Sequence, residues 1–374
     1  MLDTLPPSML AEVRRIVRED LAPLAVKIDL EGFYPEDILR KIGAAGGFRQ
    51  HLASQQPSRG CDMPAAIDAM AAAGEECLST AFMMWCQNAC GWYLENSENQ
   101  ELRRTILPGL AAGETLGGTA LSNPMKFYSG IEPMQLTAQE VPEGFRVRGQ
   151  LPWVSNLGRE HRFGAIFQVD GKQGREVMAL VPCNAEGLRV VHGAHFVALE
   201  GTRTFSVRFD DVLIPARSIL AAPAAPFLAK IRSGFILMQT GMALGLVQGS
   251  IDIMHKADRS HEHVNRFLPD RPESFEGQLA SLRGEVRSLA GTPWEQDKEF
   301  LRRVFAARLV AAQLSIAAAS AALLHAGARG FLNTAPAQRR LRESYFVAIV
   351  TPAMKHLRKE LARMEGNDAS HLRS

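Results

Sequence analysis

The stretch with the clearest potential for chemistry is GQLPWVSNLG at residues 149–158, which places Trp153, Ser155 and Asn156 close together. It follows TAQEVPEGFRVR, a pattern that predicts two short strands joined by a tight turn. A polar hairpin does not itself need an indole, a hydroxyl and an amide side by side. They suit a flat ligand with hydrogen-bonding edges. The structural alternative is that Trp153 caps a β core and Ser155 ends a strand.

Two groups of potential metal ligands are weaker candidates. Cys86 and Cys90 are four residues apart on a predicted helix. No second ligand pair has zinc-site spacing, so we interpret both as buried small residues. The spacing of His261 and His263 from His255 does not suit one helix face. We therefore expect no metal site.

The composition excludes several classes of function. The 42 Lys and Arg residues nearly balance the 40 Asp and Glu residues, so nothing favours nucleic acid or an anionic membrane as a partner. No stretch approaches the roughly twenty uninterrupted apolar residues of a membrane span. Five cysteines are an odd and sparse set, which favours a reducing compartment. With no basic region ahead of an apolar N-terminal core, we expect a cytoplasmic protein.

Three segments of different texture must position the candidate residues. Residues 1–112 predict an all-helical N-terminal domain, in which Val13 and Ile16 belong to an apolar stripe. Residues 113–222 predict an antiparallel β-barrel or sandwich domain, because short alternating runs are separated by turn dipeptides. Residues 223–374 predict a C-terminal four-helix bundle with alanine-rich contact faces. The predicted fold class is therefore α+β, with a β module between two helical parts.

This domain order and four strings of residues resemble the acyl-CoA dehydrogenase superfamily. GETLGGTALSNP resembles the strand that opens the family's β domain, and GFRVRGQLPWVSN resembles its Trp-(Ile/Val)-(Ser/Thr)-Asn hairpin. GTRTFSVRFDDVLIPARSIL resembles the strand that leaves the domain. HAGARGFLNTAPAQRRLRE resembles the C-terminal glycine turn and its following arginines. Together they span nearly the whole chain in the family's order, which implies the family's fold.

The resemblance implies an FAD site around the hairpin. Trp153 would lie near the isoalloxazine ring, and the Ser155 hydroxyl would hydrogen-bond its N5/O4 edge. Leu121 and Ser122 would serve the pyrimidine edge, with Ser122 in the place of the family's threonine. Hydrogen bonds at these ring positions tune flavin electronics.

A second set of residues is implied to reach the FAD of a neighbouring subunit. Arg266 is nearest to the family's pyrophosphate arginine, with Arg271 as its rival and a plain surface arginine as the alternative. Gln278 matches a downstream glutamine of the family. Gly327 and Gly330 match the turn that approaches the adenosine part, although glycines also end alanine-rich helices. A shared site implies a homotetramer or a homodimer.

The family's catalytic base is missing from its usual place. Such a dehydrogenase removes an α-proton with a glutamate, and counting from Arg342 places Thr351 at that position. A threonine hydroxyl is not a base at neutral pH without an activator. At the family's alternative position the alignment places Phe235, followed by Ile236 where an arginine is usual.

The predicted substrate side also departs from the family. Lys126, Tyr128 and Ser129 lie in SNPMKFYSG, where the family has Gly-Ser-Asp near the thioester. Lys126 either binds an anionic group of the substrate or is a solvated loop lysine. Met84 and Met238 predict an apolar substrate pocket.

Three functions are compatible with this sequence. The first is an FAD-dependent dehydrogenase acting on the CH–CH group of a CoA or carrier-protein thioester, with an electron-transfer flavoprotein as partner. The second is a monooxygenase of the same fold, which takes reduced FAD or FMN from a separate reductase. It would use Gln87 or His356, although a satisfied helix amide and a surface histidine are the structural alternatives. The third is a catalytically silent flavin-binding protein.

Overall fold

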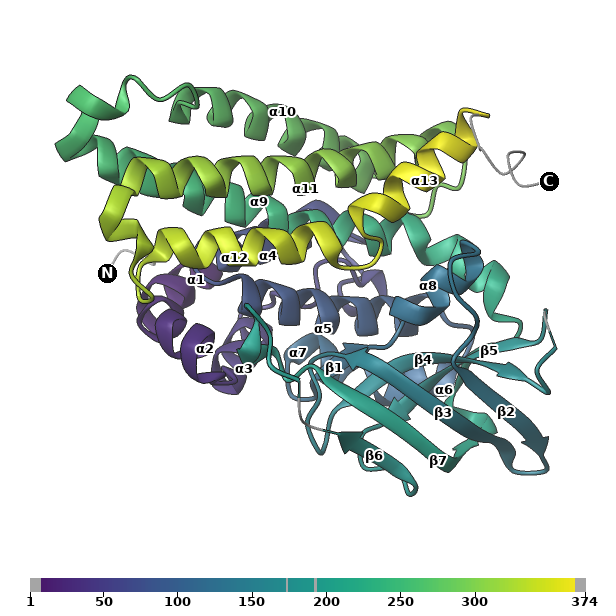
Figure 1. Cartoon of the computed structure of the whole chain (residues 1–374). Coiled ribbons are helices and arrows are strands. Elements are labelled where there is room, and N and C mark those ends of the chain that lie inside the picture. The colour runs from purple at the N-terminus through teal and green to yellow at the C-terminus, as the bar shows by residue number, and fades with distance from the viewer. Residues whose placement is uncertain (1–7, 173, 192–193, 367–374) are drawn as a thin grey trace.

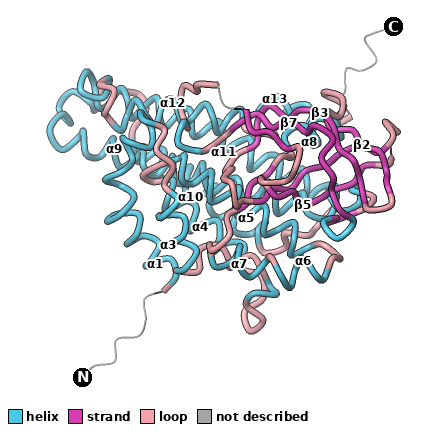
Figure 2. Tube along the Cα trace, turned by 90° about the horizontal axis from the view of Figure 1, so that it is seen from below, coloured by secondary structure: helices cyan, strands magenta, loops and turns pink. Residues whose placement is uncertain are grey.

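A computed structural model shows helices at both ends of the chain and a sheet in its middle (Figures 1 and 2). The residues it describes are 8–172, 174–191 and 194–366. Helix gives way to strand between Ala112 and Gly117, and strand gives way to helix between Ala221 and Ala224. The predicted α+β fold class, with a β module between two helical parts, is confirmed.

Seven α-helices form the described N-terminal part. They are α1 (Met9–Ile16), α2 (Ala25–Glu31), α3 (Glu36–Ala44), α4 (Met63–Gly74), α5 (Leu78–Asn96), α6 (Gln100–Thr105) and α7 (Leu107–Ala112). Helices α4 and α5 are buried on nearly all sides, as their apolar sequences predict. The segment before the β domain is divided into α6 and α7, because Pro108 suits a helix start and not its interior.

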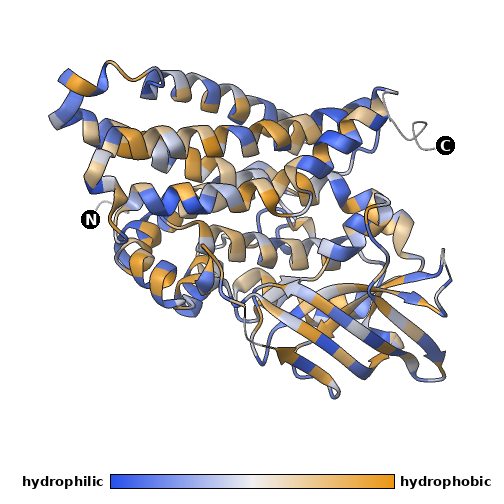
Figure 3. Ribbon diagram, in the orientation of Figure 1, coloured by the Kyte–Doolittle hydropathy of each residue, from blue (hydrophilic) through white to orange (hydrophobic). Residues whose placement is uncertain are grey.

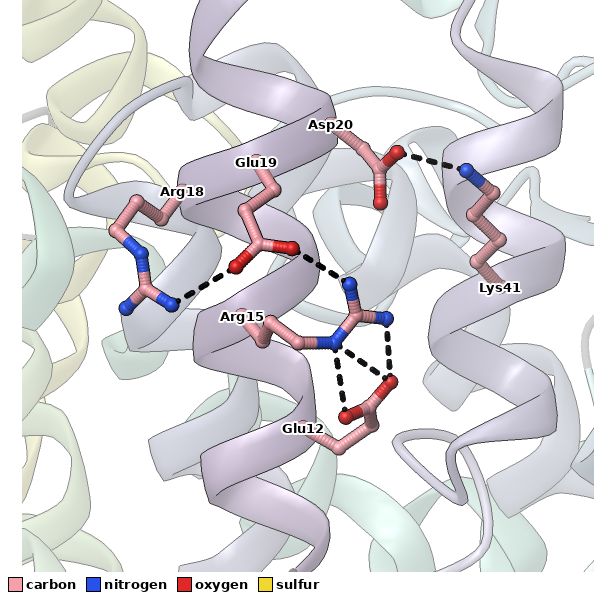
Figure 4. A network of polar contacts seen from close by, with 6 residues as sticks. All are labelled: Glu12, Arg15, Arg18, Glu19, Asp20 and Lys41. Atoms are coloured by element: carbon pink, nitrogen blue, oxygen red, sulfur yellow. Dashed lines mark hydrogen bonds and ion pairs between the residues drawn. The ribbon is translucent and has the colours of Figure 1, made fainter.

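The first predicted helix is also divided. Between α1 and α2 the chain forms a π-helical segment at Val17–Leu21 and a 3₁₀ turn at Ala22–Leu24, which contains Pro23. Ion pairs cover the outer face of this region (Figure 4): Arg15 bridges Glu12 and Glu19, and Lys41 of α3 lies 2.8 Å from Asp20. Such exposed pairs are each worth about 1 kcal/mol or less, so they orient the surface more than they stabilise it.

The described part of the β domain contains an eight-stranded sheet. Its strands are β1 (Gly117–Thr119), β2 (Leu136–Val141), β3 (Gly144–Val154), β4 (Arg162–Val169), β5 (Glu176–Pro182), β6 (Leu188–Val191), β7 (Phe205–Pro215) and β8 (Ile219–Ala221). The order is β6-β7-β3-β2-β4-β5-β8, and β1 pairs with β4. The β1–β4 and β2–β4 pairs are parallel, so the sheet is mixed and not wholly antiparallel. Apolar and polar residues alternate along the strands (Figure 3), which buries one face.

A short helix, α8 (Ser122–Tyr128), interrupts the β domain between β1 and β2. Its sequence SNPMKFY places Pro124 in the first turn, where the missing N–H costs nothing. In Figure 1, α8 lies between the sheet and the last helix of the chain. This helix therefore connects the two parts of the molecule that carry the predicted site residues.

The C-terminal helices are α9 (Ala224–Asn265), α10 (Pro272–Ala290), α11 (Lys298–Ala326), α12 (Pro336–Ile349) and α13 (Met354–Met364). The segments around α9 and α11 are long and apolar enough to cross a membrane, which is weak evidence for a span because core helices of soluble proteins pass the same test. Nearly all of the most apolar window of α9 and half of that of α11 are buried inside the fold. Helices α12 and α13 are separated by residues 350–353, where Pro352 cannot continue a helix.

Candidate functional site

The hairpin strand β3 presents Trp153 at its end. The Trp153 side chain is half exposed, with 49% of its maximal solvent-accessible surface. This exposure is unusual, because indoles are large apolar groups that proteins mostly bury. Its ring meets that of Phe196 edge-to-face, with centroids 5.7 Å apart. An exposed indole beside a cavity offers a flat apolar surface to a ligand.

Ser155 follows the end of β3 and is nearly buried, at 6% exposure. Its Oγ accepts a hydrogen bond from Thr204 Oγ1 at 2.8 Å. Among the described residues the Ser155 hydroxyl donates no hydrogen bond. The hydroxyl therefore keeps one donor for a ligand edge.

Asn156 has a structural role. Its backbone is left-handed, with φ at 63°, a conformation that asparagine tolerates. Its Oδ1 accepts from Tyr34 Oη at 2.7 Å, and its Nδ2 donates to the Gly117 carbonyl at 2.7 Å. The side chain thus joins Tyr34, which lies between α2 and α3, to β1, and leaves Trp153 and Ser155 as the candidate ligand-binding members of the hairpin.

A cavity of about 150 Å³ lies beside Trp153. It is lined by Ala120, Ser122, Asn123, Lys126, Glu132, Gln135, Leu151, Pro152 and Trp153. Lys126 Nζ is 3.3 Å from Glu132 Oε2, so its charge is already paired. Leu121, the residue before α8, is buried and is not among the residues that line this cavity.

The interruption between α12 and α13 brings Thr351 to the same place. Thr351 Oγ1 is 3.0 Å from Ser122 Oγ. Glu343, the nearest acidic residue of this region in the sequence, is buried elsewhere: it accepts from the Leu78 N–H at the start of α5 and pairs with Arg340 at 2.8 Å. A hydroxyl pair thus stands where the resemblance implies a carboxylate.

A hydrogen-bonded chain behind Thr351 holds it in place. Gln239 of α9 donates from Nε2 to the Thr351 carbonyl at 2.8 Å, and its Oε1 accepts from Arg308 Nε at 3.0 Å. Arg308 of α11 is fully buried and also donates to the Val347 carbonyl at 2.6 Å. Burial lowers the pKa of Arg308 to about 10, so it stays charged at neutral pH.

Sequence reasoning missed both members of this chain. The available signal was a lone arginine inside the alanine-rich run FAARLVAAQ, on a helix whose other inward positions are mostly apolar. Gln239 gave no comparable signal, because it lies 69 positions from Arg308 and 112 from Thr351.

Gln87 is engaged with the backbone. Its Nε2 donates to the carbonyls of Leu110 and Thr115 at 2.9 and 3.0 Å, and its Oε1 accepts from the Gly117 N–H at 2.6 Å. These bonds fix the connection from α7 to β1. With both amide atoms occupied, Gln87 has no polar group directed at a substrate.

The methionines predicted to line a substrate pocket, Met84 and Met238, lie in the hydrophobic core with no exposed surface. Neither borders the cavities beside Trp153 and His356. Between α5 and α9 the rings of Trp85 and Phe235 pack edge-to-face, 5.0 Å apart. Aromatic side chains therefore fill the space between these helices.

His356 lies in a second cavity, together with Tyr128 and Ser129. It is 5% exposed, so it is not the surface histidine of the structural alternative. Its Nε2 is 2.6 Å from Ser129 Oγ. Burial is the largest cause that lowers the pKa of His356. The Glu360 charge raises this pKa, and the Lys359 and Lys126 charges lower it. The net lowering keeps the ring neutral at pH 7.

The residues predicted to reach a neighbouring subunit lie at the other end of the bundle. Gly327 and Gly330 follow α11, and Arg266 follows the end of α9, far from the sheet in Figure 1. The guanidinium of Arg266 is 5.5 Å from the Phe267 ring centroid, and Gln278 bonds only within its own helix. The 42 residues of α9 span about 63 Å, so one chain does not bring this set to Trp153.

The rival Arg271 is 3.0 Å from Asp258, so its charge is paired. His255 pairs with Glu276 at 2.7 Å and not with the other histidines. Cys86 and Cys90 are buried free thiols. Within the described ranges, no three His, Cys, Asp or Glu side chains gather as a metal site.

Comparisons with known proteins agree with this architecture. Residues 8–114 match the family model of the acyl-CoA dehydrogenase N-terminal domain. The mitochondrial short-chain specific acyl-CoA dehydrogenase of Rattus norvegicus is 23% identical over 355 residues, which cover 90% of this chain and 84% of that protein.

Two solved structures share the fold over nearly their whole length. Butyryl-CoA dehydrogenase from Megasphaera elsdenii superposes with a TM-score of 0.82 at 16% identity, covering 97% of this chain and 99% of that chain. Dibenzothiophene monooxygenase from Paenibacillus superposes with a TM-score of 0.79 at 17% identity, covering 95% and 96%. Residues 8–114 are thus similar to the N-terminal domain of acyl-CoA dehydrogenases, and the whole chain shares the fold of these proteins.

Proposed function

We propose that the chain is a flavin-dependent oxidoreductase that binds FAD in the cavity beside Trp153. The observation that carries this proposal is the nearly buried Ser155 hydroxyl, which accepts from Thr204 and donates no hydrogen bond in the described residues, next to the half-exposed Trp153 indole. An aromatic ring with acceptors on its edge fits both groups. Ser122 adds a second hydroxyl on the wall of the same cavity.

The first candidate reaction is oxidation of the CH–CH group of an acyl thioester, carried by CoA or by a carrier protein. The curated relatives named as acyl-CoA dehydrogenases support this reaction. When bound, the flavin would take up the hydride. Trp153 would exclude water from the ring, and Ser155 would orient it. His356 is neutral at pH 7 and lines a cavity that also contains Pro352, so it is the candidate to accept the proton.

An anaerobic titration tests this reaction. The purified protein is loaded with FAD, and acyl-CoA thioesters of increasing chain length are added while the flavin absorbance is followed. Bleaching by a thioester supports the dehydrogenase. Bound FAD that no thioester bleaches would exclude it.

The second candidate is a monooxygenase that receives reduced FAD or FMN from a separate reductase. The Thr351–Ser122 hydroxyl pair favours it, because no carboxylate stands at the position of the family's base. When bound, the reduced flavin would activate oxygen. Supplying reduced flavin and oxygen with aromatic substrates, and analysing products by mass spectrometry, tests it. Unchanged substrate with simple peroxide release would exclude it.

The proposed assembly is a cytoplasmic homotetramer or homodimer. In it, Arg266, Gln278, Gly327 and Gly330 would reach the FAD of a neighbouring chain, since they are remote from Trp153 in their own chain. Light scattering of the FAD-loaded protein tests this arrangement. A monomer with fully bound FAD would contradict it. The redox partner would be an electron-transfer flavoprotein for the dehydrogenase and a flavin reductase for the monooxygenase.

A further inference from the structure

The second cavity, of about 190 Å³, lies between α8, the first turns of α9 and α13. Its apolar wall includes Leu228, Ile236, Phe305 and Leu357. A water molecule takes about 30 Å³ of liquid volume, so this cavity is several times larger than one water. Its size and apolar wall suit a short hydrocarbon chain.

One cation in this cavity lacks an ion-pair partner. Arg232 lines the wall, and its Nε is buried without a hydrogen bond. In the described part of the chain no acidic side chain lies within 4.0 Å of its guanidinium. The guanidinium is 5.7 Å from the Phe305 ring centroid. A partly buried, unpaired guanidinium is costly, and a bidentate anion removes that cost.

The rest of the polar wall consists of Tyr128, Ser129, the neutral His356 and Glu360. Lys359 Nζ of α13 donates to the Ser129 carbonyl at 2.7 Å. His356, also on α13, is hydrogen-bonded through Nε2 to the Ser129 hydroxyl. Glu360 is the acidic residue of the lining, and its carboxylate lies 3.4 Å from Arg363 Nη1. The lining thus carries one cation, Arg232, and one carboxylate, Glu360, whose charge acts on Arg232 without an ion pair between them.

We propose that this cavity binds the carboxylate of a short apolar acid, or of an acyl group that ends in a carboxylate, with the Arg232 guanidinium as its ion-pair partner. As a substrate site the cavity rests on the proposed function, because Pro352 connects its wall to Thr351. As a carboxylate site it stands on its own. The guanidinium fork matches a carboxylate in two parallel hydrogen bonds, and the apolar wall holds the chain.

The test is calorimetric titration of the full-length protein with hexanoate and with hexan-1-ol, which has the same chain and no charge. We expect hexanoate to bind at least about tenfold more tightly, as charge-assisted hydrogen bonds imply. Equal binding of the two, or tighter binding of inorganic phosphate than of hexanoate, would overturn the carboxylate assignment.

Variants then identify the cation. Arg232→Gln should raise the hexanoate dissociation constant at least about tenfold and leave that of hexan-1-ol unchanged. Arg232→Lys keeps the charge without the fork and should give an intermediate loss. The control is Arg358→Gln, an exposed arginine of α13, which should bind hexanoate like the unmodified protein. Unchanged binding by both Arg232 variants would overturn the proposal.

The titration needs no flavin, so two failures can be told apart. Hexanoate binding that depends on Arg232, in a protein that binds no flavin, would keep the carboxylate site and remove the proposed function. Flavin binding without a preference for hexanoate over hexan-1-ol would keep the proposed function and remove the carboxylate site.

Discussion

At the scale of single residues, the hairpin side chains divide into one with a structural role and two that we propose to face the flavin. Asn156 uses both ends of its amide inside the protein. Trp153 is half exposed, and Ser155 keeps a free O–H. Thr351 replaces a carboxylate by a hydroxyl that bonds Ser122. These differences lead to two predictions.

Ser155→Ala should weaken flavin binding by about 0.5–1.5 kcal/mol, roughly two- to tenfold, because one hydrogen bond to the ring edge is lost. Titration of FAD followed by flavin fluorescence and absorbance measures this change. The control is Ser206→Ala on β7, whose hydroxyl accepts from Gln150 on the exposed face of the sheet. Equal affinity and an unchanged spectrum in Ser155→Ala would remove the flavin assignment of the hairpin.

Thr351→Glu should raise acyl-CoA dehydrogenase activity by about 10²-fold, because it supplies a general base at the family's position. Thr351→Gln is the matched control, similar in shape but unable to take the proton. Reduction of the flavin by a thioester under anaerobic conditions measures both. Identical rates in the two variants would show that position 351 does not face the substrate carbon.

At the scale of elements, three helices meet on one buried arginine. Arg308 of α11 bonds Gln239 of α9 and the end of α12, and Gln239 bonds Thr351. The interruption at Pro352 would otherwise leave carbonyls of α12 without partners. The buried cation thus fixes the connection that carries Thr351.

Gln239→Leu should lower the free energy of unfolding by about 2–4 kcal/mol, because it leaves Arg308 Nε as an unpartnered buried charge. Denaturant unfolding measures this loss. The control is Gln248→Leu on the same helix, whose bond to Asp252 is exposed, with an expected change under about 0.5 kcal/mol.

Adding Arg308→Met to Gln239→Leu should recover part of the lost stability. The double variant no longer contains the buried Arg308 guanidinium that Gln239→Leu leaves without a hydrogen-bond acceptor. If the two losses simply add, the two side chains are not coupled and the chain of bonds to Thr351 is not a unit.

At the scale of the whole molecule, buried histidines make stability depend on pH. His51 is fully buried, with Nε2 2.9 Å from the Asn88 carbonyl, and burial lowers its pKa to about 4. Its ordinary value is 6.5, so between pH 6.5 and 4 the unfolded chain takes up a proton that the folded protein refuses. Stability is therefore full above pH 6.5 and falls as the pH drops.

This effect amounts to about 3 kcal/mol for His51 when pH 4 is reached. His161 and His356 act in the same direction, since burial lowers the pKa of each. In His51→Gln, unfolding measured from pH 7 to pH 4 should show a shallower decline than in the unmodified protein. Parallel pH profiles would contradict the depressed pKa of His51.

Much of the molecule could be predicted from the sequence. The change from helical periodicity to short alternating runs located the β module, and the Trp153 hairpin marked the candidate cofactor surface. Two later features could not be predicted in the same way. The Arg308–Gln239–Thr351 chain depends on three segments meeting in space, and the burial of His356 depends on α8 covering it. Local sequence patterns carry neither kind of information.

The bond between Tyr34 and Asn156 has a consequence for protein engineering. The β domain is one continuous segment of the chain, so it looks as if it could be exchanged as a unit. Its cofactor hairpin, however, is tied at Asn156 to a tyrosine from the first helical domain. A chimera that contains only residues 113–222 of this chain would leave the side-chain amide oxygen of Asn156 without its donor, the Tyr34 hydroxyl. The interchangeable unit is the β domain together with Tyr34.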